Sequence, residues 1–301
     1  MDKFPSRERE SAVALEPRVS AIVVVRNVQS VSAEHALDLS LRAALAEPWI
    51  DDLVIVDAGN APGISSSLRA LQMDRRNVKV VVAPLGASAG AAANFGAEQA
   101  RGRWLLFLAP NVILQRGAAE RLAAAGGSAR TPWLVGGKLT DAEGRERSAA
   151  RTGSLSTWSA VAVALGVSGG RPSTRRGAVG RDDAPLPAEV GAVSGVFMLA
   201  PKNDFQALGG FDEQFLTDGA DLDLCRRARA AGGSVLFQPV AAGVQFVRPH
   251  LGGRKQAQGL ALFAVRSART PIEKAFAIIA APALGVIVGL RDFVAGRPPA
   301  R

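Results

Sequence analysis

VSAIVVV at Val19–Val25 is the first of four similar apolar segments, and their alternation with helical patterns indicates the fold class. LVIV at Leu53–Val56, VKVVV at Val78–Val82 and WLLFL at Trp104–Leu108 follow it along the chain. Most of them are rich in β-branched residues, which favour strands. Between strands one and two, apolar residues recur at helical spacing, and Ala89–Ala100 has helical character. This alternation predicts an α/β fold with a mostly parallel central sheet and helices on both faces.

Ligands of such sheets bind outside the carboxyl ends of the strands. Polar or small residues that directly follow a predicted strand are therefore the first candidates for a site. They are Arg26, Asn27, Asp57, Ala58, Gly59 and Asn111.

The second half of the chain has a weaker pattern. Ser168–Gly191 is rich in Gly, Pro and charge and has no apolar period, which predicts a loop. Val193–Leu199 is a predicted strand, and Leu222–Ala231 is a predicted amphipathic helix. Ser234–Phe237 and Val244–Val247 are predicted as two further short strands.

Composition excludes several classes of protein. The net charge is +9, but 48% of the 301 residues are hydrophobic and only 21% are charged, so a disordered polycation is excluded. The chain has no Tyr and only 5% aromatic residues, which argues against nucleic acid as a partner. Its single cysteine, Cys225, forms no internal disulfide, and we expect a cytoplasmic protein.

The two ends differ from the rest of the chain. Residues 1–18 carry mixed charge without the apolar stretch of a signal peptide, so we expect a flexible segment. Residues 270–301 are predicted as a basic apolar helix and tail. Ala275–Leu290 is apolar for sixteen residues, roughly 24 Å of helix, which is shorter than the roughly 30 Å hydrocarbon layer of a bilayer. A core helix and an interfacial membrane helix both fit this segment.

The positive charge is concentrated at the C-terminal end. Residues 245–301 hold nine basic and two acidic side chains, so +7 of the net +9 lies there. Basic residues beside an apolar helix are attracted to anionic lipid, at about 1 kcal/mol for each well-placed Lys or Arg. This charge predicts association with a membrane surface, and a solvated tail is the alternative.

Val193–Phe246 reads VSGVFMLAPKNDFQALGGFDEQFLTDGADLDLCRRARAAGGSVLFQPVAAGVQF and resembles the second half of the family 2 inverting glycosyltransferases, the rhamnosyltransferase-like members especially. SAIVVVRN at Ser20–Asn27, LVIVDAGN at Leu53–Asn60 and ANFGAEQARGRWLLFLAPN at Ala93–Asn111 follow the order and spacing of the first half of that family. The resemblance covers about Ser20–Arg269.

The resemblance implies the GT-A fold in one domain at residues 19–269. In that family a nucleotide-binding half precedes an acceptor-binding half, here about 19–112 and about 130–269. The family's catalytic base is the Asp of a Glu-Asp pair, which maps onto Ala220 and Asp221. Asp221 is therefore the candidate base. The alternative is that Asp221 and Asp223 only stabilise the first turn of the following helix, where carboxylates are favoured.

The resemblance also implies a donor site. Asp57 matches the residue that contacts the nucleotide base, with Asn60 as a cap of the next helix. Arg26 and Asn27 line the same crevice, and Asn94 lies in a segment that packs against the nucleotide. Asn111 completes the predicted nucleotide-sugar site, and Asp223, Arg254 and Lys255 are assigned to the acceptor or the diphosphate.

The metal motif of the family is degenerate here. Asn111 stands where the family has a metal-binding Asp, and Gln245 stands where it has a His. Mg²⁺ and Mn²⁺ prefer anionic oxygens, so the amides predict weak metal binding. His250 is a substitute ligand or a surface loop residue. Basic residues at 248–255 offer a metal-independent way to neutralise the departing diphosphate.

These observations predict transfer of a sugar from a nucleotide carrier, dTDP-rhamnose or a UDP-sugar, to a lipid-linked or polysaccharide acceptor. The predicted location is the inner face of the cytoplasmic membrane. The alternative is a catalytically silent glycosyltransferase-like protein that binds a partner. A third option is an NAD-dependent oxidoreductase, and the sequence argues against it, because RNVQS follows Val25 where that class has a glycine-rich turn.

Overall fold

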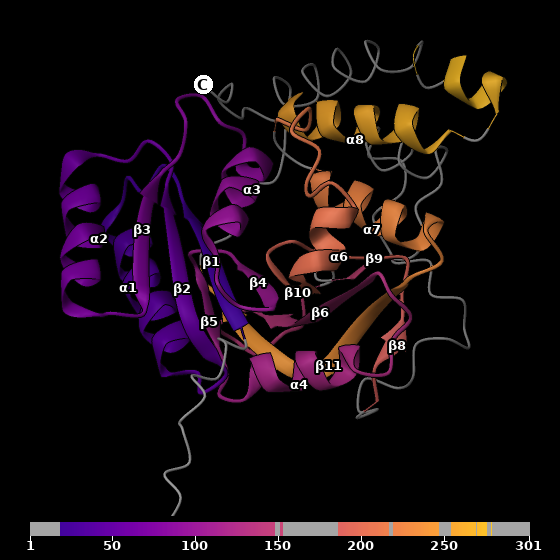
Figure 1. Cartoon of the computed structure of the whole chain (residues 1–301). Coiled ribbons are helices and arrows are strands. Elements are labelled where there is room, and N and C mark those ends of the chain that lie inside the picture. The colour runs from indigo at the N-terminus through magenta and orange to yellow at the C-terminus, as the bar shows by residue number, and fades with distance from the viewer. Residues whose placement is uncertain are drawn as a thin grey trace, which may run out of the picture.

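A central sheet between two layers of helices forms the body of the molecule (Figure 1). The computed structural model describes residues 19–147, 151–152, 186–216, 219–246, 254–268, 270–275 and 278. In these residues the main sheet has nine strands in the order β3-β2-β1-β4-β10-β6-β11-β5, with β8 paired to β11. The predicted α/β class is therefore confirmed.

The N-terminal half of the sheet is parallel, as predicted. Its strands are β1 (Val19–Val25), β2 (Ile50–Asp57), β3 (Val78–Val82) and β4 (Trp104–Leu108). The second strand begins earlier than its apolar residues indicate, because Ile50 pairs with Val19 at the start of β1.

The C-terminal half is mixed. Its strands are β5 (Val112–Leu114), β6 (Trp133–Thr140), β8 (Ala188–Glu189), β10 (Phe197–Pro201) and β11 (Ser234–Gln245). β10 runs antiparallel to both β4 and β6, and β6 runs parallel to β11. The strands β1, β2, β3, β4, β6 and β11 therefore all end at the same edge of the sheet, which we call the carboxyl edge.

Three predicted segments differ from the structure. The single strand predicted at Val193–Leu199 is divided between two strands, β9 (Ala192–Val193) and β10. β9 pairs with β7 (Arg151–Thr152) in a separate small sheet. The two short strands predicted after Ser234 are one strand, β11, whose pairing with β6 shifts between Gln238 and Ala242. Pro239 lies in this irregularity, because proline has no N–H for a regular ladder. Of the loop predicted at Ser168–Gly191, residues 168–185 lie outside the described residues, and the described remainder contains the short strand β8.

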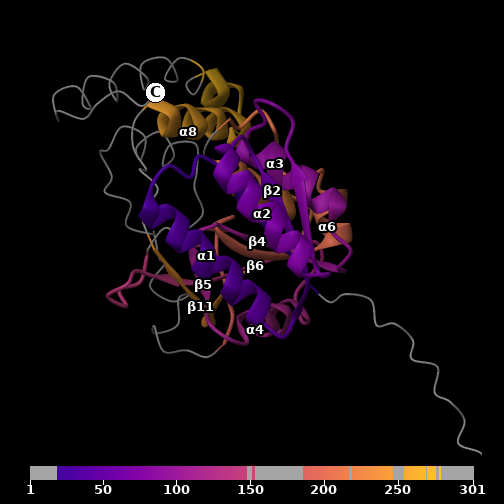
Figure 2. The same cartoon turned by 90° about the vertical axis from the view of Figure 1, so that its left-hand side faces the viewer.

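Helices cover both faces of the sheet (Figures 1 and 2). One face carries α1 (Val31–Ala46), α2 (Pro62–Asp74) and α4 (Ala118–Gly126). The other face carries α3 (Ala89–Gln99), α6 (Lys202–Ala207) and α7 (Ala220–Ala230). α8 (Arg254–Ser267) packs against α7 on the side away from the sheet.

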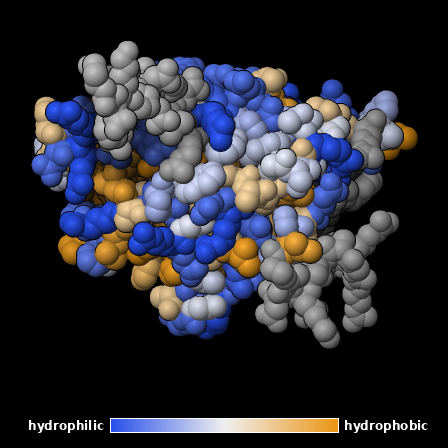
Figure 3. Space-filling model, turned by 60° about the horizontal axis from the view of Figure 1, so that its bottom comes forward, coloured by the Kyte–Doolittle hydropathy of each residue, from blue (hydrophilic) through white to orange (hydrophobic). Residues whose placement is uncertain are grey.

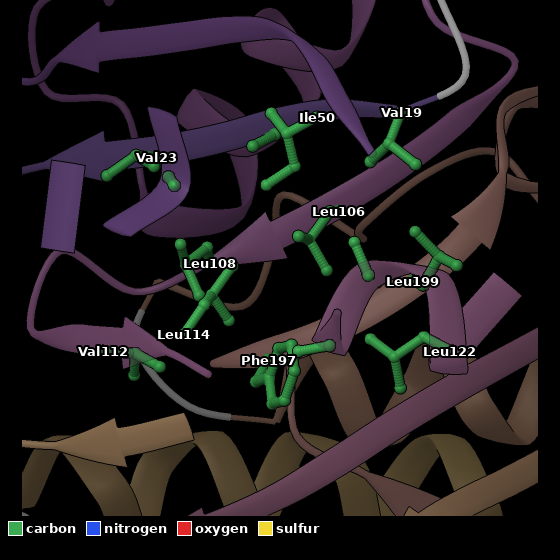
Figure 4. Close-up of a cluster of buried hydrophobic side chains, with 14 of the residues drawn as sticks. Val19, Val23, Ile50, Leu106, Leu108, Val112, Leu114, Leu122, Phe197 and Leu199 are labelled. Carbon is green, nitrogen blue, oxygen red and sulfur yellow. The ribbon is translucent and has the colours of Figure 1, made fainter. Parts of the chain in front are cut away.

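Two hydrophobic clusters hold these layers together. Figure 4 shows the first, in which Phe197, Leu106 and Leu122 meet between the sheet and α4. The second contains three packed rings, Phe107, Phe205 and Phe211, whose centroids are 4.9 to 5.3 Å apart. The ring of Phe211 joins the sheet to the turn that precedes α7.

The surface in Figure 3 shows hydrophobic residues in separate groups between hydrophilic ones. Among the described helices, none combines the length and the apolar character that a membrane span requires. The apolar segment predicted at Ala275–Leu290 lies outside the described residues except for 275 and 278.

Close packing of α3 on the sheet gives a stability prediction. A methyl group on Gly96 would lie 2.7 Å from a methyl of Val56 and 2.8 Å from one of Ile22. Gly96→Ala is therefore expected to lower the free energy of unfolding by about 1–3 kcal/mol. Gly63 of α2 has open space around it, so Gly63→Ala is the control and is expected to raise stability by about 0.4–1 kcal/mol. Denaturant unfolding measures both, and equal effects would contradict this packing.

Candidate functional site

The carboxyl edge brings most of the predicted site residues together. Arg26 and Asn27 follow β1, Asp57 ends β2, Asn111 lies between β4 and β5, and Gln245 ends β11. β4 pairs in parallel with β1 on one side and antiparallel with β10 on the other. The strand order β3-β2-β1-β4 reverses between β1 and β4, and such a switch point is the usual ligand site of an open α/β sheet.

Asn60 joins the loops that follow β1 and β2. Its Nδ2 donates to the carbonyl of Val25 at 2.8 Å and to Asp57 Oδ1 at 2.7 Å, and its Oδ1 accepts from the Val28 amide at 3.2 Å. The N-cap of α2 is Ala61, so the predicted capping role of Asn60 is wrong. Asn60 was missed as an organising residue because its partners are distant in sequence.

Asn27 has a left-handed backbone in this linked pair of loops, with φ of 58°. A non-glycine residue in that region is uncommon, and such residues concentrate at binding sites. Both Asn27 and Arg26 are exposed. Their predicted contact with the donor stays a prediction.

Asp57 is buried and well supplied with hydrogen bonds. Its side chain is 4% exposed, Oδ2 accepts from the Ser65 hydroxyl at 2.5 Å, and Oδ1 accepts from Asn60. Burial alone raises the pKa of a carboxyl group, but here hydrogen bonds from Ser65 and Asn60 and the charge of Arg69 outweigh it and lower the pKa of Asp57. Asp57 is therefore an ionised acceptor at the carboxyl edge, and its contact with a nucleotide base stays a prediction.

The lowered pKa of Asp57 predicts a pH-dependent contribution to stability. The ionised form is favoured by folding, so the stabilisation is present above the unfolded-state pKa of about 3.9 and is lost as pH falls through the lower folded-state pKa. The difference in free energy of unfolding between wild type and Asp57→Asn is expected to shrink below about pH 4. Denaturant titrations between pH 3 and pH 7 measure it, with exposed Asp74→Asn as the control for loss of one charge. A difference that grows toward acid pH would contradict the assignment.

Asn94 of α3 fixes the turn that contains Gly210 and Phe211. Its Oδ1 accepts from the Phe211 amide at 2.9 Å, and its Nδ2 donates to the Phe211 carbonyl at 2.8 Å and to Glu213 at 3.1 Å. Gly210 has φ of 67°, and a methyl group on it would lie 2.6 Å from Asn94 Oδ1. The amide of Asn94 thus holds protein backbone, and the predicted contact with the nucleotide stays a prediction.

Asp223 holds the same turn from α7. It is 2% exposed and forms ion pairs with Arg226 and Arg227, both at 2.7 Å. Arg227 in turn donates to the carbonyls of Leu208 and Gly210. Asp223 is therefore part of an interior network, and its predicted contact with acceptor or diphosphate stays a prediction.

Asp221 lies at the start of α7 with its carboxylate fixed by backbone amides. Oδ2 accepts from the Gly195 amide at 3.0 Å and Oδ1 from the Leu222 amide at 2.9 Å. A methyl group on Gly90 would lie 3.7 Å from Cβ of Ala220, so α3 and α7 begin side by side. Two helix N-termini that meet favour negatively charged groups between them. Asp221 is half-buried and so remains accessible there.

The two positions expected to bind a metal are neighbours. Val112 pairs with Gln245, and the Phe246 amide donates to the carbonyl of Asn111 at 2.9 Å. Both side chains offer neutral amide oxygens, and Gln245 is only 6% exposed. Within the described parts of the chain, no three His, Cys, Asp or Glu residues come together as a metal site. The residues present therefore do not fit a divalent metal well.

Three further candidates are described only in part or lie outside the described residues. His250 lies outside the described residues. Arg254 and Lys255 begin α8, but their side chains are not described. Their predicted roles are therefore untested.

Sequence reasoning missed Arg147, which follows the hairpin after β6. Its Nη2 donates to the carbonyl of Gln245 at 3.0 Å. Asp141 and Gly144 are typical turn residues, but nothing in the sequence pairs this turn with β11.

A separate groove of about 690 Å³ lies between α1 and α2. Its walls include Leu37, Leu41, Ile64 and Leu71. None of the predicted site residues lines it, so it is distinct from the carboxyl edge.

Comparisons with known proteins give structural neighbours alone. No family model matches the chain, and no curated protein sequence is similar to it. GalNAc-T7, solved with UDP, GalNAc and Mn²⁺, is 14% identical with a TM-score of 0.66 over 91% of this chain and 52% of that chain. This chain therefore spans about half the length of GalNAc-T7.

Two other neighbours cover more of their own length. S. aureus TarS 1–349 with UDP-GlcNAc is 12% identical with a TM-score of 0.52, over 89% of this chain and 71% of that chain. The mannosyltransferase PcManGT from Pyrobaculum calidifontis, with GDP-Man and Mn²⁺, is 15% identical with a TM-score of 0.54, over 96% and 77%. At these identities the likeness establishes the fold, so the chain has the GT-A fold of these glycosyltransferases.

Proposed function

We propose that this chain is an inverting glycosyltransferase that moves a sugar from a nucleotide-sugar donor to an acceptor hydroxyl. The proposal is supported by the GT-A fold and depends on one observation, the position of Asp221. Its carboxylate is oriented by the amides of Gly195 and Leu222 and remains accessible at the start of α7. An oriented, accessible carboxylate beside the carboxyl edge suits a general base.

In the proposed reaction Asp221 takes the proton of the acceptor hydroxyl. The acceptor oxygen forms a bond to the anomeric carbon while the bond from that carbon to the diphosphate oxygen breaks. Because the acceptor attacks from the face opposite the diphosphate, the anomeric configuration inverts. The nucleoside diphosphate leaves with the electron pair of the broken bond, so the site must stabilise its growing negative charge.

The donor would bind across the loops after β1 and β2. Arg26 and Asn27 are exposed there, and the ionised carboxylate of Asp57 is an acceptor for a ring N–H of the base. Asn94 and Asn111 complete the proposed donor site. The donor we expect is a UDP-sugar or dTDP-rhamnose, as in the rhamnosyltransferase-like members of family 2.

We propose that the diphosphate is neutralised by cationic side chains. GalNAc-T7 and PcManGT were solved with Mn²⁺, whereas this chain offers the amides of Asn111 and Gln245. Arg254 and Lys255, at the start of α8, are the cations first expected from the sequence, and His250 is the substitute ligand if Mg²⁺ or Mn²⁺ binds. Guanidinium and ammonium groups stabilise a departing phosphate as a metal ion does.

The acceptor we propose is lipid-linked or polysaccharide, which places the protein peripherally at the inner face of the cytoplasmic membrane. Residues 245–301 carry +7 of the net charge, and cationic residues near anionic lipid contribute about 1 kcal/mol each. In this proposal residues 19–269 form the catalytic domain, 1–18 precede it, and 270–301 contact the membrane. The product would be a cell-surface polysaccharide.

A second candidate function is a catalytically silent glycosyltransferase-like protein that binds a nucleotide-sugar or a partner enzyme. The observation that favours it is the loss of acidic side chains at the carboxyl edge. Asn111 and Ala220 stand where the family has carboxylates, and Gln245 stands where it has a His. Such a protein would keep the donor site without transfer.

The two acidic residues in the first turn of α7 separate these possibilities. Asp221→Asn is expected to lower the transfer rate by at least about 100-fold, because an amide cannot take the proton. Its melting temperature is expected to stay close to wild type, since the amide oxygen still accepts from Gly195. The assay is release of nucleoside diphosphate from a panel of nucleotide-sugars with lipid-linked and polysaccharide acceptors.

Asp223→Asn is the matched control. It weakens the ion pairs with Arg226 and Arg227, so it is expected to lower the melting temperature, which Asp221→Asn leaves close to wild type. Transfer by Asp221→Asn at the wild-type rate would exclude Asp221 as the base. Donor binding by wild type without transfer to any acceptor would favour the silent protein.

A further inference from the structure

The guanidinium of Arg147 is a partly buried charge that the proposed mechanism does not yet use. Its backbone amide donates to the carbonyl of Leu139 at 2.8 Å, which closes the hairpin after β6. Its Nη2 donates to the carbonyl of Gln245 at 3.0 Å. The side chain therefore lies at the carboxyl edge, where β6 and β11 end.

The charge of Arg147 is not balanced by the described residues. Its Nε is buried without a hydrogen-bond partner among them, and none of their carboxylates forms an ion pair with it. Arg145 in the same hairpin is different, because it pairs with Asp141 and Glu143 at 2.9 Å. A guanidinium is always ionised, and burying an ion without a counter-charge is unfavourable. The geometry around Arg147 thus calls for an anion.

The contacts of the peptide group between Gln245 and Phe246 indicate where such an anion would lie. Arg147 donates to its carbonyl, and the carbonyl of Asn111 accepts from its N–H at 2.9 Å. Arg147 and Asn111 therefore lie on opposite sides of one peptide at the end of β11. The side chains of Asn111 and Gln245 are neutral amides, which bind divalent metal ions weakly. A tightly held metal ion is therefore not expected to supply positive charge at this position.

We infer that Arg147 binds the diphosphate of the donor and supplies this positive charge. The inference rests on the proposed function, because the ligand class is a nucleoside diphosphate. A guanidinium donates two parallel hydrogen bonds to phosphate oxygens, which fixes orientation as well as charge. Arg147 contacts the departing group, whereas Asp221 contacts the attacking hydroxyl.

The test compares diphosphates with monophosphates. UDP, GDP, dTDP and the matching monophosphates are titrated calorimetrically, in EDTA, into wild type and Arg147→Gln. Wild type is expected to bind one of the diphosphates more tightly than its monophosphate. Arg147→Gln is expected to weaken diphosphate binding by about 10- to 100-fold and monophosphate binding much less.

Two variants control for charge and folding. Arg145→Gln removes the same charge from the same hairpin and is expected to leave both affinities unchanged. Arg147→Lys keeps the charge but not the paired donors, so it is expected to lose part of the diphosphate preference at a wild-type melting temperature. It provides the test if Arg147→Gln does not fold.

The outcomes separate the inference from the proposed function. If wild type binds no nucleotide, with or without Mn²⁺, both are overturned. If wild type binds a diphosphate and the Arg147 variants bind it as Arg145→Gln does, the inference is overturned and the donor site stands. Binding that appears only when Mn²⁺ replaces EDTA also overturns the inference.

Discussion

The antiparallel pairing of β10 with β4 is the constraint on which the site depends. Phe197 pairs with Leu108, and the Ala109 amide donates to the carbonyl of Val196 at 2.8 Å. This register places the residues just before β10 at the carboxyl edge, and one of them, Gly195, orients Asp221 through its amide. A parallel strand at this position would begin at the opposite edge and could not present that amide. The direction of one strand therefore sets the place of the proposed base.

The parallel half of the fold was predictable from local patterns. The bounds of β3 and β4 were predicted to the residue, because their apolar runs are flanked by clear breaks. β6 was missed because WLVGGKLT contains Gly136 and Gly137, which weaken a strand signal. Both glycines are required by tertiary contacts: a methyl group on Gly136 would lie 2.5 Å from Cβ of Val193, and one on Gly137 would overlap the ring of Phe197. Partners so distant in sequence leave no local pattern.

In the candidate site, too, some features were predictable from local sequence patterns and others depended on partners distant in sequence. The position of Asp57 at the end of a strand followed from the α/β pattern, and the neighbourhood of Asn111 and Gln245 agrees with the resemblance. The roles of Asn60 and Arg147 did not follow, since each acts through backbone groups of another segment. A sequence displays which charges a chain has, but their balance depends on which carboxylates the fold brings near. Arg145 pairs with carboxylates of its own hairpin, whereas Arg147 has no such partner among the described residues.

A crystal structure with UDP and MnCl₂, with manganese located by anomalous scattering, would show whether a guanidinium or a metal ion holds the diphosphate. We expect the nucleotide at the carboxyl edge, its diphosphate against the guanidinium of Arg147, and no manganese between Asn111 and Gln245. A nucleotide bound elsewhere, or a manganese ion held by Asn111 and Gln245 against the diphosphate, would contradict the role of Arg147.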